Sequence, residues 1–137
     1  MMKLKSLLLA ALLAAGPAQA ADLHGMISAS AHRHGVPQAL AHGIVRVESG
    51  YNCRARNPRS SAKGLMQVID GTARGVGVHG NRLDCHVGLE AGMRVLRQAF
   101  VVAGGNWCVA ATIFNTGSGR HCSGYGRRVL SFARGVL

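Results

Sequence analysis

Glu48 is the residue of this 137-residue chain whose surroundings best suit acid chemistry. Leu40, Ile44 and Val47 recur at helical spacing, and at roughly 100° per residue Glu48 falls about 40° from Ile44, at the border of this apolar stripe. Gly50 is a natural helix stop, which puts Glu48 in the last turn, at the negative end of the helix dipole. Partial burial and the dipole both raise its pKa, so the carboxyl could protonate a glycosidic oxygen as a general acid. The alternative interpretation is a solvated glutamate that ends a helix.

The elements that must position this residue are almost all predicted to be helices. Asp22 is expected to cap a helix that runs to about His34, and Pro37 suits the first turn of the helix that carries Glu48. No stretch alternates convincingly between apolar and polar residues, so we expect little or no sheet. The other expected segments are a loop over 51–63, short helical turns over 64–69 and 70–74, a long helix over 86–103 capped by Asp84, and helices over 106–114 and from about 126.

The start of the chain has the composition of an export signal. Lys3 and Lys5 precede an apolar run over 7–15, which is followed by Pro17 and a small-residue site that ends at Ala20. This pattern predicts a signal peptide over residues 1–20, and location in the periplasm or outside the cell after its removal. The apolar run is too short to span a bilayer, so we expect no membrane anchor after cleavage. Residues 21–137 are enough for one domain and too few for two.

The charge balance is strongly basic. Sixteen Lys and Arg residues face five Asp and Glu residues, giving a formal net charge of +11 at pH 7. A basic exported protein is expected to meet an anionic envelope polymer or an anionic membrane surface. The arginines are scattered and the chain has a single tryptophan, with no series of aromatics for stacking bases. We therefore expect no nucleic-acid partner.

Four cysteines in an exported chain of this size predict two disulfides. A helix over 86–103 would be roughly 27 Å long, so Cys108 beyond its far end could not reach Cys85 at its near end. The favoured pairing is therefore Cys53 with Cys85 and Cys108 with Cys122. Pairing of Cys53 with Cys108 and of Cys85 with Cys122 is the alternative.

Three motif matches lack the context that their chemistry needs. Cys85-His86 and His121-Cys122 suggest zinc ligands, but no Cys-x-x-Cys or His-x-x-x-His spacing accompanies them. The glycines over 75–80 fit a dinucleotide fingerprint without the preceding strand, and the Ser-x-x-Lys over 60–63 lacks its partner motifs. We therefore expect no metal and no cofactor.

Four groups of residues share an order and spacing typical of one family. They are Glu48-Ser49-Gly50-Tyr51-Asn52, Ala62-Lys63-Gly64-Leu65-Met66-Gln67-Val68, Phe114-Asn115-Thr116-Gly117, and Tyr125 with Arg128-Val129. This set resembles the soluble lytic transglycosylase (SLT) domain, a relative of goose-type lysozyme, over residues 23–129. The resemblance implies a helical, lysozyme-like fold with Glu48 at the floor of a cleft between helical lobes.

The resemblance also implies a role for each matching position. Glu48 corresponds to the family's single catalytic acid, and Ser49 to the serine beside it. The strip that holds glycan corresponds to Gly64, Leu65, Met66 and Gln67, with an apolar contact from Met66 and an amide from Gln67.

Three aromatic or amide positions complete the expected site. Asn115 corresponds to the asparagine of the family's Ala-Tyr-Asn motif, and Tyr125 to a later aromatic near the acid. Phe114 departs from the pattern, since the family usually has tyrosine there, so a phenol contact to the acid from that position is lost. Core packing is the alternative role for Phe114 and for Met66.

The small number of acids bears on mechanism. Ordinary glycoside hydrolysis uses two carboxyls roughly 5 to 9.5 Å apart. Asp22 and Asp84 look like helix caps, and Glu90 lies on an arginine-flanked helix. The resemblance implies a one-acid reaction on peptidoglycan glycan strands, in which Glu48 serves as acid and then as base and a 1,6-anhydro sugar forms without water.

Two other functions remain open at this point. A hydrolytic muramidase would use the same fold and Glu48, with Asp70 as the nearest candidate base. A non-catalytic peptidoglycan-binding or assembly protein would suit the small size and the missing motif tyrosine. Small exported domains that resemble this one often open the wall locally, so secretion, pilus or conjugation machinery is an expected partner.

Overall fold

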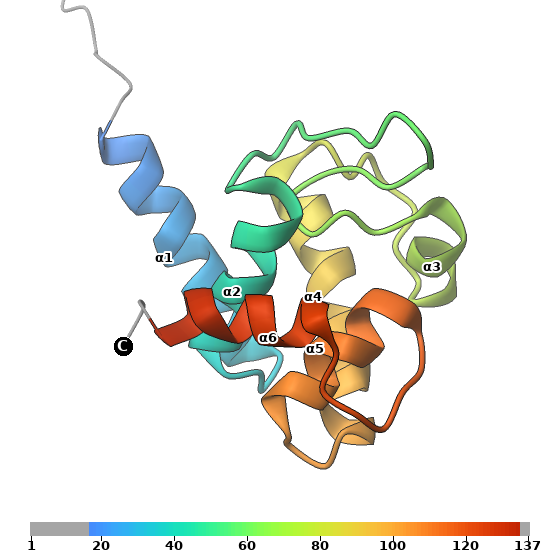
Figure 1. The fold of residues 1–137 in the computed structure, drawn as a ribbon. Helices are drawn as coiled ribbons and strands as arrows, with labels where there is room; N and C mark the ends of the chain where they lie inside the picture. Colours follow the sequence, from blue (N-terminus) through green and yellow to red (C-terminus); the bar gives the residue numbers. More distant parts are fainter. Residues whose placement is uncertain (1–16, 135–137) are drawn as a thin grey trace, which may run out of the picture.

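The structure, a computed structural model, describes residues 17–134, with side chains from residue 22 onward (Figure 1). Within this range the chain forms six helices and no strand, with isolated antiparallel bridges that join Lys63 to Arg56 and to Val68. The prediction of a mainly helical domain with little or no sheet is confirmed. The helices are α1 (Pro17–Arg33), α2 (Gln38–Ser49), α3 (Asp70–Gly75), α4 (Cys85–Val102), α5 (Trp107–Thr116) and α6 (Gly124–Ala133).

The ends of the helices follow local sequence signals. Gly50 ends α2 with a left-handed backbone (φ 57°) and donates its N–H to the carbonyl of Arg46. The side chain of Asp84 accepts hydrogen bonds from two backbone N–H groups in the first turn of α4, and that of Asn106 accepts one from Val109 in the first turn of α5. These caps satisfy backbone donors that have no partner within the helix, so the predicted helix starts there are confirmed.

Two local predictions are wrong. The first helix begins at Pro17, so Asp22 lies within α1 rather than at its cap. The segment 64–69 is not helical, because Gly64 (φ 85°) and Gln67 (φ 52°) adopt left-handed backbone that turns the chain between the two bridges. The predicted signal peptide lies outside the described residues except for its last four residues, which belong to α1. None of the helices described here has the length and apolar content needed to cross a membrane.

The helices pack around one apolar core. Figure 1 shows α1, α2 and α6 on one side and α3 with the segment 51–69 on the other, and contacts join the two sides through α4 and α5. Leu40 and Ile44 of α2, the residues that predicted its buried stripe, are fully buried. The largest other fully buried side chains include Ile27, Leu65, Met66, Leu89, Met93, Leu96 and Val129.

Two disulfides tie loops to the helices. Cys53, just beyond α2, is bonded to Cys85 at the start of α4, with Cα atoms 5.0 Å apart. Cys108 in α5 is bonded to Cys122, just before α6, with Cα atoms 5.1 Å apart. The favoured pairing from the sequence is confirmed.

Gly92 allows α4 to pack directly against Met66, and its substitution tests how tight that packing is. A Cβ atom at Gly92 would overlap the Cβ and Sδ atoms of Met66, which is itself fully buried. We expect Gly92→Ala to lower the free energy of unfolding by about 1–3 kcal/mol through overpacking. In the control Gly25→Ala, on α1, a Cβ meets nothing within 4 Å, so helix propensity raises stability by up to about 1 kcal/mol. Urea denaturation measures both, and equal effects would contradict the packing argument.

Candidate active site

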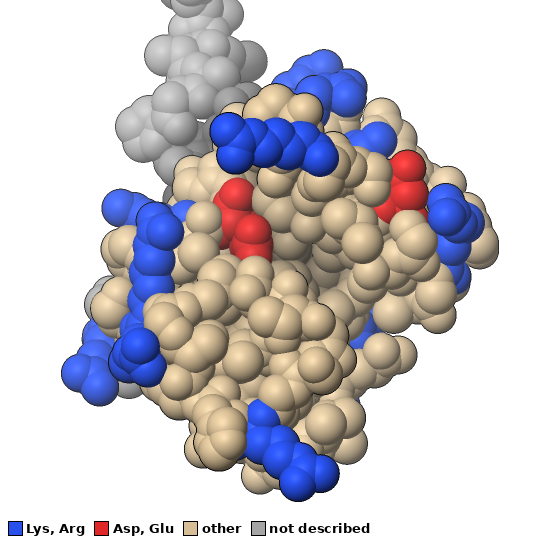
Figure 2. Space-filling model, turned by 45° about the vertical axis from the view of Figure 1, so that its right-hand side comes forward, with Lys and Arg blue, Asp and Glu red and all other residues tan. Residues whose placement is uncertain are grey.

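The side chain of Glu48, in the last turn of α2, borders a cavity of about 470 Å³. The segment 51–69 and α3 form one wall, α5 forms the opposite wall, and α4 contributes Val95. Figure 2 shows the hollow on this face, with acidic side-chain atoms beside it and Lys and Arg side chains around its edges. The lining residues are Glu48, Asn57, Ala62, Gln67, Val68, Ile69, Thr72, Val95, Ile113, Phe114, Asn115, Thr116 and Gly117.

The surroundings of Glu48 favour the protonated form of its carboxyl group. Burial raises the pKa of Glu48 above its usual value, and a hydrogen bond from Tyr125 opposes this rise without cancelling it. The Tyr125 hydroxyl donates to Oε1 of Glu48 at 2.5 Å. Burial, reinforced by the neighbouring Glu48, raises the pKa of Tyr125 itself, so its hydroxyl keeps its proton. A carboxyl with a raised pKa gives its proton to a leaving group as a general acid, and the carboxylate that results can take a proton back.

The phenol that contacts Glu48 therefore comes from α6. Phe114 on α5 lines the cavity with a ring that has no hydroxyl, as the sequence resemblance implied. Tyr125 lies in the first turn of α6, 77 residues from Glu48, and is not among the residues that line the cavity. Tyr125 thus orients the acid from behind the cavity while Phe114 faces into it.

The chain has only two glutamates, which makes the state of Glu48 directly measurable. In ¹³C NMR of a glutamate-labelled sample, we expect the Glu48 carboxyl to titrate above the usual value of 4.5. Burial of Glu90 raises its pKa, but the Arg94 hydrogen bond and His34 together outweigh burial, so Glu90 titrates below that value. Tyr125→Phe removes a donor to the charged form and is expected to raise the pKa of Glu48 further.

A matched control removes a different phenol. The Tyr51 hydroxyl pairs with Nδ1 of His42 at 3.0 Å and makes no hydrogen bond to Glu48. Tyr51→Phe should therefore leave both glutamate titrations in place. A Glu48 pKa that falls in Tyr125→Phe would contradict the assigned hydrogen bond.

Gln67 lines the cavity, and part of its side-chain amide is already hydrogen-bonded within the protein. Its Nε2 group donates to the backbone carbonyls of Ala55 (3.1 Å) and Gly64 (2.9 Å). Both amide hydrogens are therefore occupied, and only Oε1 is left to bind a ligand. The amide expected from the sequence is thus placed to accept a hydrogen bond from a hydroxyl or an N–H group rather than to donate one.

The other residues of the predicted strip do not line the cavity. Leu65 and Met66 are fully buried in the core and are absent from the lining, so in the structure Met66 has a packing role. Gly64 is also buried, and a Cβ atom at this position would overlap the carbonyl oxygen of Arg82, so there is no room for a side chain. Ser49 donates its hydroxyl to the carbonyl of Val45 at 3.2 Å and is also absent from the lining.

Several lining residues were not singled out from the sequence. Asn57, Thr72 and Ile69 come from the loop and short helix opposite Glu48, and Val95 comes from α4. Ile69 carries the clearest signal, since it is a large apolar side chain that stays 46% exposed beside the cavity. Such exposure is visible only in the folded chain, so sequence patterns could not have found it.

Comparison with known proteins identifies the family. The sequence profile described as "Transglycosylase SLT domain" matches residues 25–127. This chain belongs to the SLT domain family. It is also 31% identical over 94 residues to the soluble lytic murein transglycosylases of Escherichia coli strain K12 and of Escherichia coli O157:H7. Each match covers 62% of this chain but only 14% of the relative, so the chain spans about a seventh of the length of these proteins.

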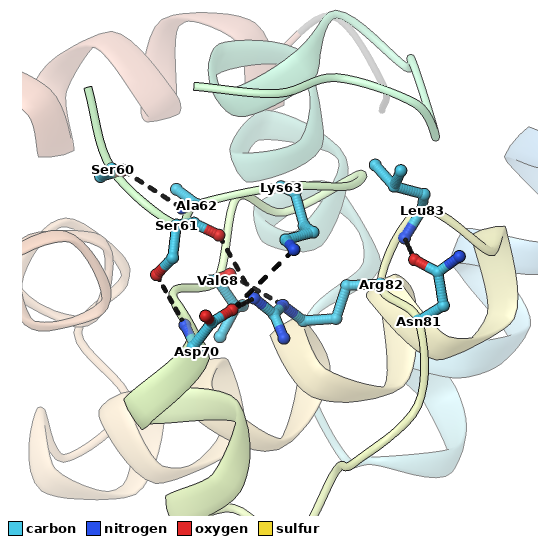
Figure 3. Close-up of polar contacts among 9 residues, drawn as sticks. All are labelled: Ser60, Ser61, Ala62, Lys63, Val68, Asp70, Asn81, Arg82 and Leu83. Carbon is cyan, nitrogen blue, oxygen red and sulfur yellow. Dashed lines mark hydrogen bonds and ion pairs between the residues drawn. The ribbon is translucent and has the colours of Figure 1, made fainter. Parts of the chain in front are cut away.

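A buried arginine holds one wall of the cavity of this SLT domain in place (Figure 3). Arg82, whose side chain is 8% exposed, donates from Nε to the carbonyl of Val68 at 2.9 Å. Its Nη2 donates to the carbonyl of Ser61 at 3.3 Å and to Oδ1 of Asp70 at 2.5 Å, and Lys63 lies 4.0 Å from the same carboxylate. The arginine thus links the backbone at two points of the segment 51–69 to the carboxyl group at the start of α3.

The remaining acids of the SLT domain are engaged elsewhere. The hydrogen bond from Arg82 holds the pKa of Asp70 below its usual value, with Lys63 and Arg74 adding to the effect. Asp84 caps α4, and Glu90 binds Arg94 at 2.8 Å and His34 at 3.3 Å. Among the described residues no three His, Cys, Asp or Glu side chains are grouped to hold a metal ion, and all four cysteines form disulfides.

Proposed function

We propose that this protein is a peptidoglycan lytic transglycosylase. The observation that carries the proposal is that Glu48 is the one carboxyl among the described residues that line the cavity, and that burial favours its protonated form. The proposed substrate is a glycan strand, and the proposed cut lies between N-acetylmuramic acid and N-acetylglucosamine. Membership of the SLT family and the likeness to soluble lytic murein transglycosylases support this substrate class.

The reaction needs one carboxyl that acts twice. Glu48 gives its proton to the glycosidic oxygen, and the bond from that oxygen to C1 of N-acetylmuramic acid breaks. The resulting carboxylate takes the proton of the 6-hydroxyl of the same sugar while O6 bonds to C1. The product is a 1,6-anhydro end, Glu48 is protonated again, and no water is consumed. The Tyr125 hydroxyl stabilises the intermediate carboxylate, because it donates to Oε1.

The geometry disfavours the hydrolytic alternative. A muramidase would need a second carboxyl to activate or replace water, and Asp70 was the nearest candidate from the sequence. Asp70 is bound by Arg82 and does not line the cavity. A carboxylate already satisfied by a guanidinium is a weak base, as the lowered pKa of Asp70 indicates.

Mass spectrometry of digested peptidoglycan tests the proposal. We expect muropeptides that end in 1,6-anhydro-N-acetylmuramic acid, each lighter by one water than the corresponding hydrolysis product. Reducing-end products would instead identify a muramidase. Release of no fragments would favour a non-catalytic wall-binding protein.

We also propose that the protein acts on the wall from the periplasm or the cell exterior. The proposal is supported by the export signal expected over residues 1–20 and by two disulfides, which form in oxidising compartments. Local wall opening for secretion, pilus or conjugation machinery would suit so small a domain. Fractionation of cells that produce the full chain tests the location.

A further inference from the structure

A second cavity, of about 420 Å³, lies between α1, α4 and the segment that follows α3. It shares no lining residue with the cavity beside Glu48. One of its walls is the segment 77–80, which belongs to the glycine-rich stretch that fits a dinucleotide fingerprint in the wrong context. The volume is in the range of cavities that bind small molecules, so the chemistry of its walls indicates what it could hold.

Ser30 of α1 lines this cavity, and its hydroxyl group has no hydrogen-bond partner among the described residues. The residue is only 1% exposed. Every fully enclosed side-chain nitrogen or oxygen in the described part of the chain does have a partner, so the Ser30 oxygen is not enclosed. The small exposed area of the residue therefore includes this oxygen. A hydroxyl that is buried without a partner costs free energy, and a ligand in the cavity could supply the missing hydrogen bond.

Arg33, three residues further along α1, brings a positive charge to the cavity. Its side chain is exposed and makes no hydrogen bond or ion pair with the rest of the described chain. Arg94 lines the cavity as well, but its Nε donates to Oε1 of Glu90 at 2.8 Å and its Nη1 to the carbonyl of Val76 at 2.9 Å. Because the charges of Glu90 and Arg94 offset each other, the charge of Arg33 remains available to a ligand.

The same cavity has an apolar side. Val78, Val87 and Leu89 line it, and an aliphatic group placed against them would lose contact with water. The side chains of His79 and His86 also line the cavity, are exposed, and make no hydrogen bond with other described residues. An imidazole can donate or accept a hydrogen bond, so both can contact a polar ligand. The cavity thus combines an apolar patch with one free cation and one free hydroxyl group.

We propose that this cavity binds a monoanion in which a carboxylate lies beside a short branched aliphatic group. The planar guanidinium of Arg33 matches the two oxygens of a carboxylate, and the Ser30 hydroxyl donates to the same ligand. The aliphatic group packs against the apolar patch. A dianion such as phosphate suits the cavity less, because the Glu90 carboxylate also lines it and repels a second negative charge. A free aliphatic acid and the carboxyl end of a peptide both offer this chemistry.

Matched small molecules test the ligand class, with binding followed by NMR chemical shifts of the ¹⁵N-labelled protein. N-acetylleucine carries a carboxylate and a branched aliphatic group, and N-acetylleucinamide has the same body without the charge. We expect saturable shift changes in α1, the segment 77–80 and the first half of α4, with the acid bound about tenfold or more tightly than the amide. Equal affinities for the two, or inorganic phosphate bound as tightly as N-acetylleucine, would overturn the proposal.

Arg33→Gln tests the cation. It is expected to lower the affinity for N-acetylleucine about tenfold and to change the affinity for N-acetylleucinamide little. Arg120→Gln is the matched control, because it removes the same charge from an exposed residue that lines neither cavity. Salt screens so distant a charge, so the control should bind N-acetylleucine as the wild type does. Equal losses in the two variants would show that net charge alone attracts the acid, which would overturn the site.

Ser30→Ala tests the hydroxyl group. We expect it to weaken binding of N-acetylleucine several-fold without lowering the thermal midpoint of the free protein, because the hydroxyl has no partner there to lose. A midpoint that falls together with unchanged binding would contradict the role given to Ser30.

The compound 4-methylpentanoate separates the two sources of the carboxylate. It has the carboxylate and branched chain of N-acetylleucine but no amide group. Tighter binding of N-acetylleucine would identify the carboxyl end of a peptide as the ligand, and binding of 4-methylpentanoate at least as tight would identify a free aliphatic acid. All of these measurements are made without a glycan, so their outcome is independent of the proposed lytic reaction.

Discussion

Glu48→Gln is expected to lower the rate of glycan cleavage by about 10³-fold or more, because one residue supplies both the acid and the base of the proposed reaction. Glutamine keeps the shape of the side chain, and its oxygen can still accept the hydrogen bond from Tyr125. It has no proton to give to the leaving sugar. Loss of turbidity in a suspension of purified peptidoglycan measures the change. Equal clearing by both proteins would refute the catalytic assignment.

Glu90→Gln is the matched control, since Glu90 is the other glutamate of the chain and does not line the cavity beside Glu48. It should retain clearing within a few-fold while it loses the ion pairs to Arg94 and His34. This pair of variants separates loss of a proton donor from loss of a negative charge.

Stability gives Glu48→Gln a second signature. The folded pKa of Glu48 is raised, so the folded chain binds this proton more tightly than the unfolded chain, and the wild type loses stability as the pH rises from about 4.5 through the folded pKa. Glutamine does not ionise. Near neutral pH its thermal midpoint should therefore be no lower than that of the wild type. A midpoint that falls steeply would show that the carboxylate form is structurally required.

Removal of the disulfide between Cys53 and Cys85 is expected to have the largest effect on stability. The bond closes a sequence separation of 32 residues, and a loop of that length corresponds to about 3–4 kcal/mol in the chain-entropy account. Cys53→Ser with Cys85→Ser should lower the thermal midpoint by about 10–15 °C. Calorimetry of the oxidised proteins measures the shift, and a loss below about 1 kcal/mol would contradict the prediction.

The second disulfide serves as the comparison. Cys108→Ser with Cys122→Ser opens a sequence separation of 14 residues, for which the same account gives about 3 kcal/mol. Only the Cys53–Cys85 bond anchors the loop that forms a cavity wall. We therefore expect its removal to weaken glycan binding at temperatures where both variants remain folded, and equal binding would show that Arg82 alone holds the wall.

Local signals in the sequence were sufficient for most of the fold. The stripe of Leu40 and Ile44 predicted the buried face of α2, and Gly50 predicted its end, because both depend on neighbours within a few residues. The length expected for the helix over 86–103 excluded a bond between Cys85 and Cys108, and the structure decided between the two pairings that remained. The prediction of a helical turn over 64–69 was wrong, because Gly64 and Gln67 adopt left-handed backbone there, and the carbonyl of the adjoining Val68 accepts a hydrogen bond from Arg82, which is distant in sequence.

The site was predictable only in part. Glu48, Gln67, Phe114 and Asn115 do line one cavity, as the resemblance implied. Leu65 and Met66 do not, since both are fully buried, and Met66 packs against α4 where Gly92 leaves space. A sequence motif records which residue types occur together, and it does not say which side chains face a ligand and which fill the core.

The sequence by itself predicted that this protein is helical, that it contains two disulfides, and that one glutamate lies in the last turn of a helix that is buried on one face. The helical pattern depends on neighbours within a few residues, and the disulfides were expected from the number of cysteines in an exported chain. Only the tertiary structure decided that Tyr125 holds Glu48, that Arg82 fixes the wall formed by the segment 51–69, and that none of the described residues lining the cavity is cationic. Each of these depends on groups brought together from distant parts of the chain, and their positions follow from packing of the whole domain.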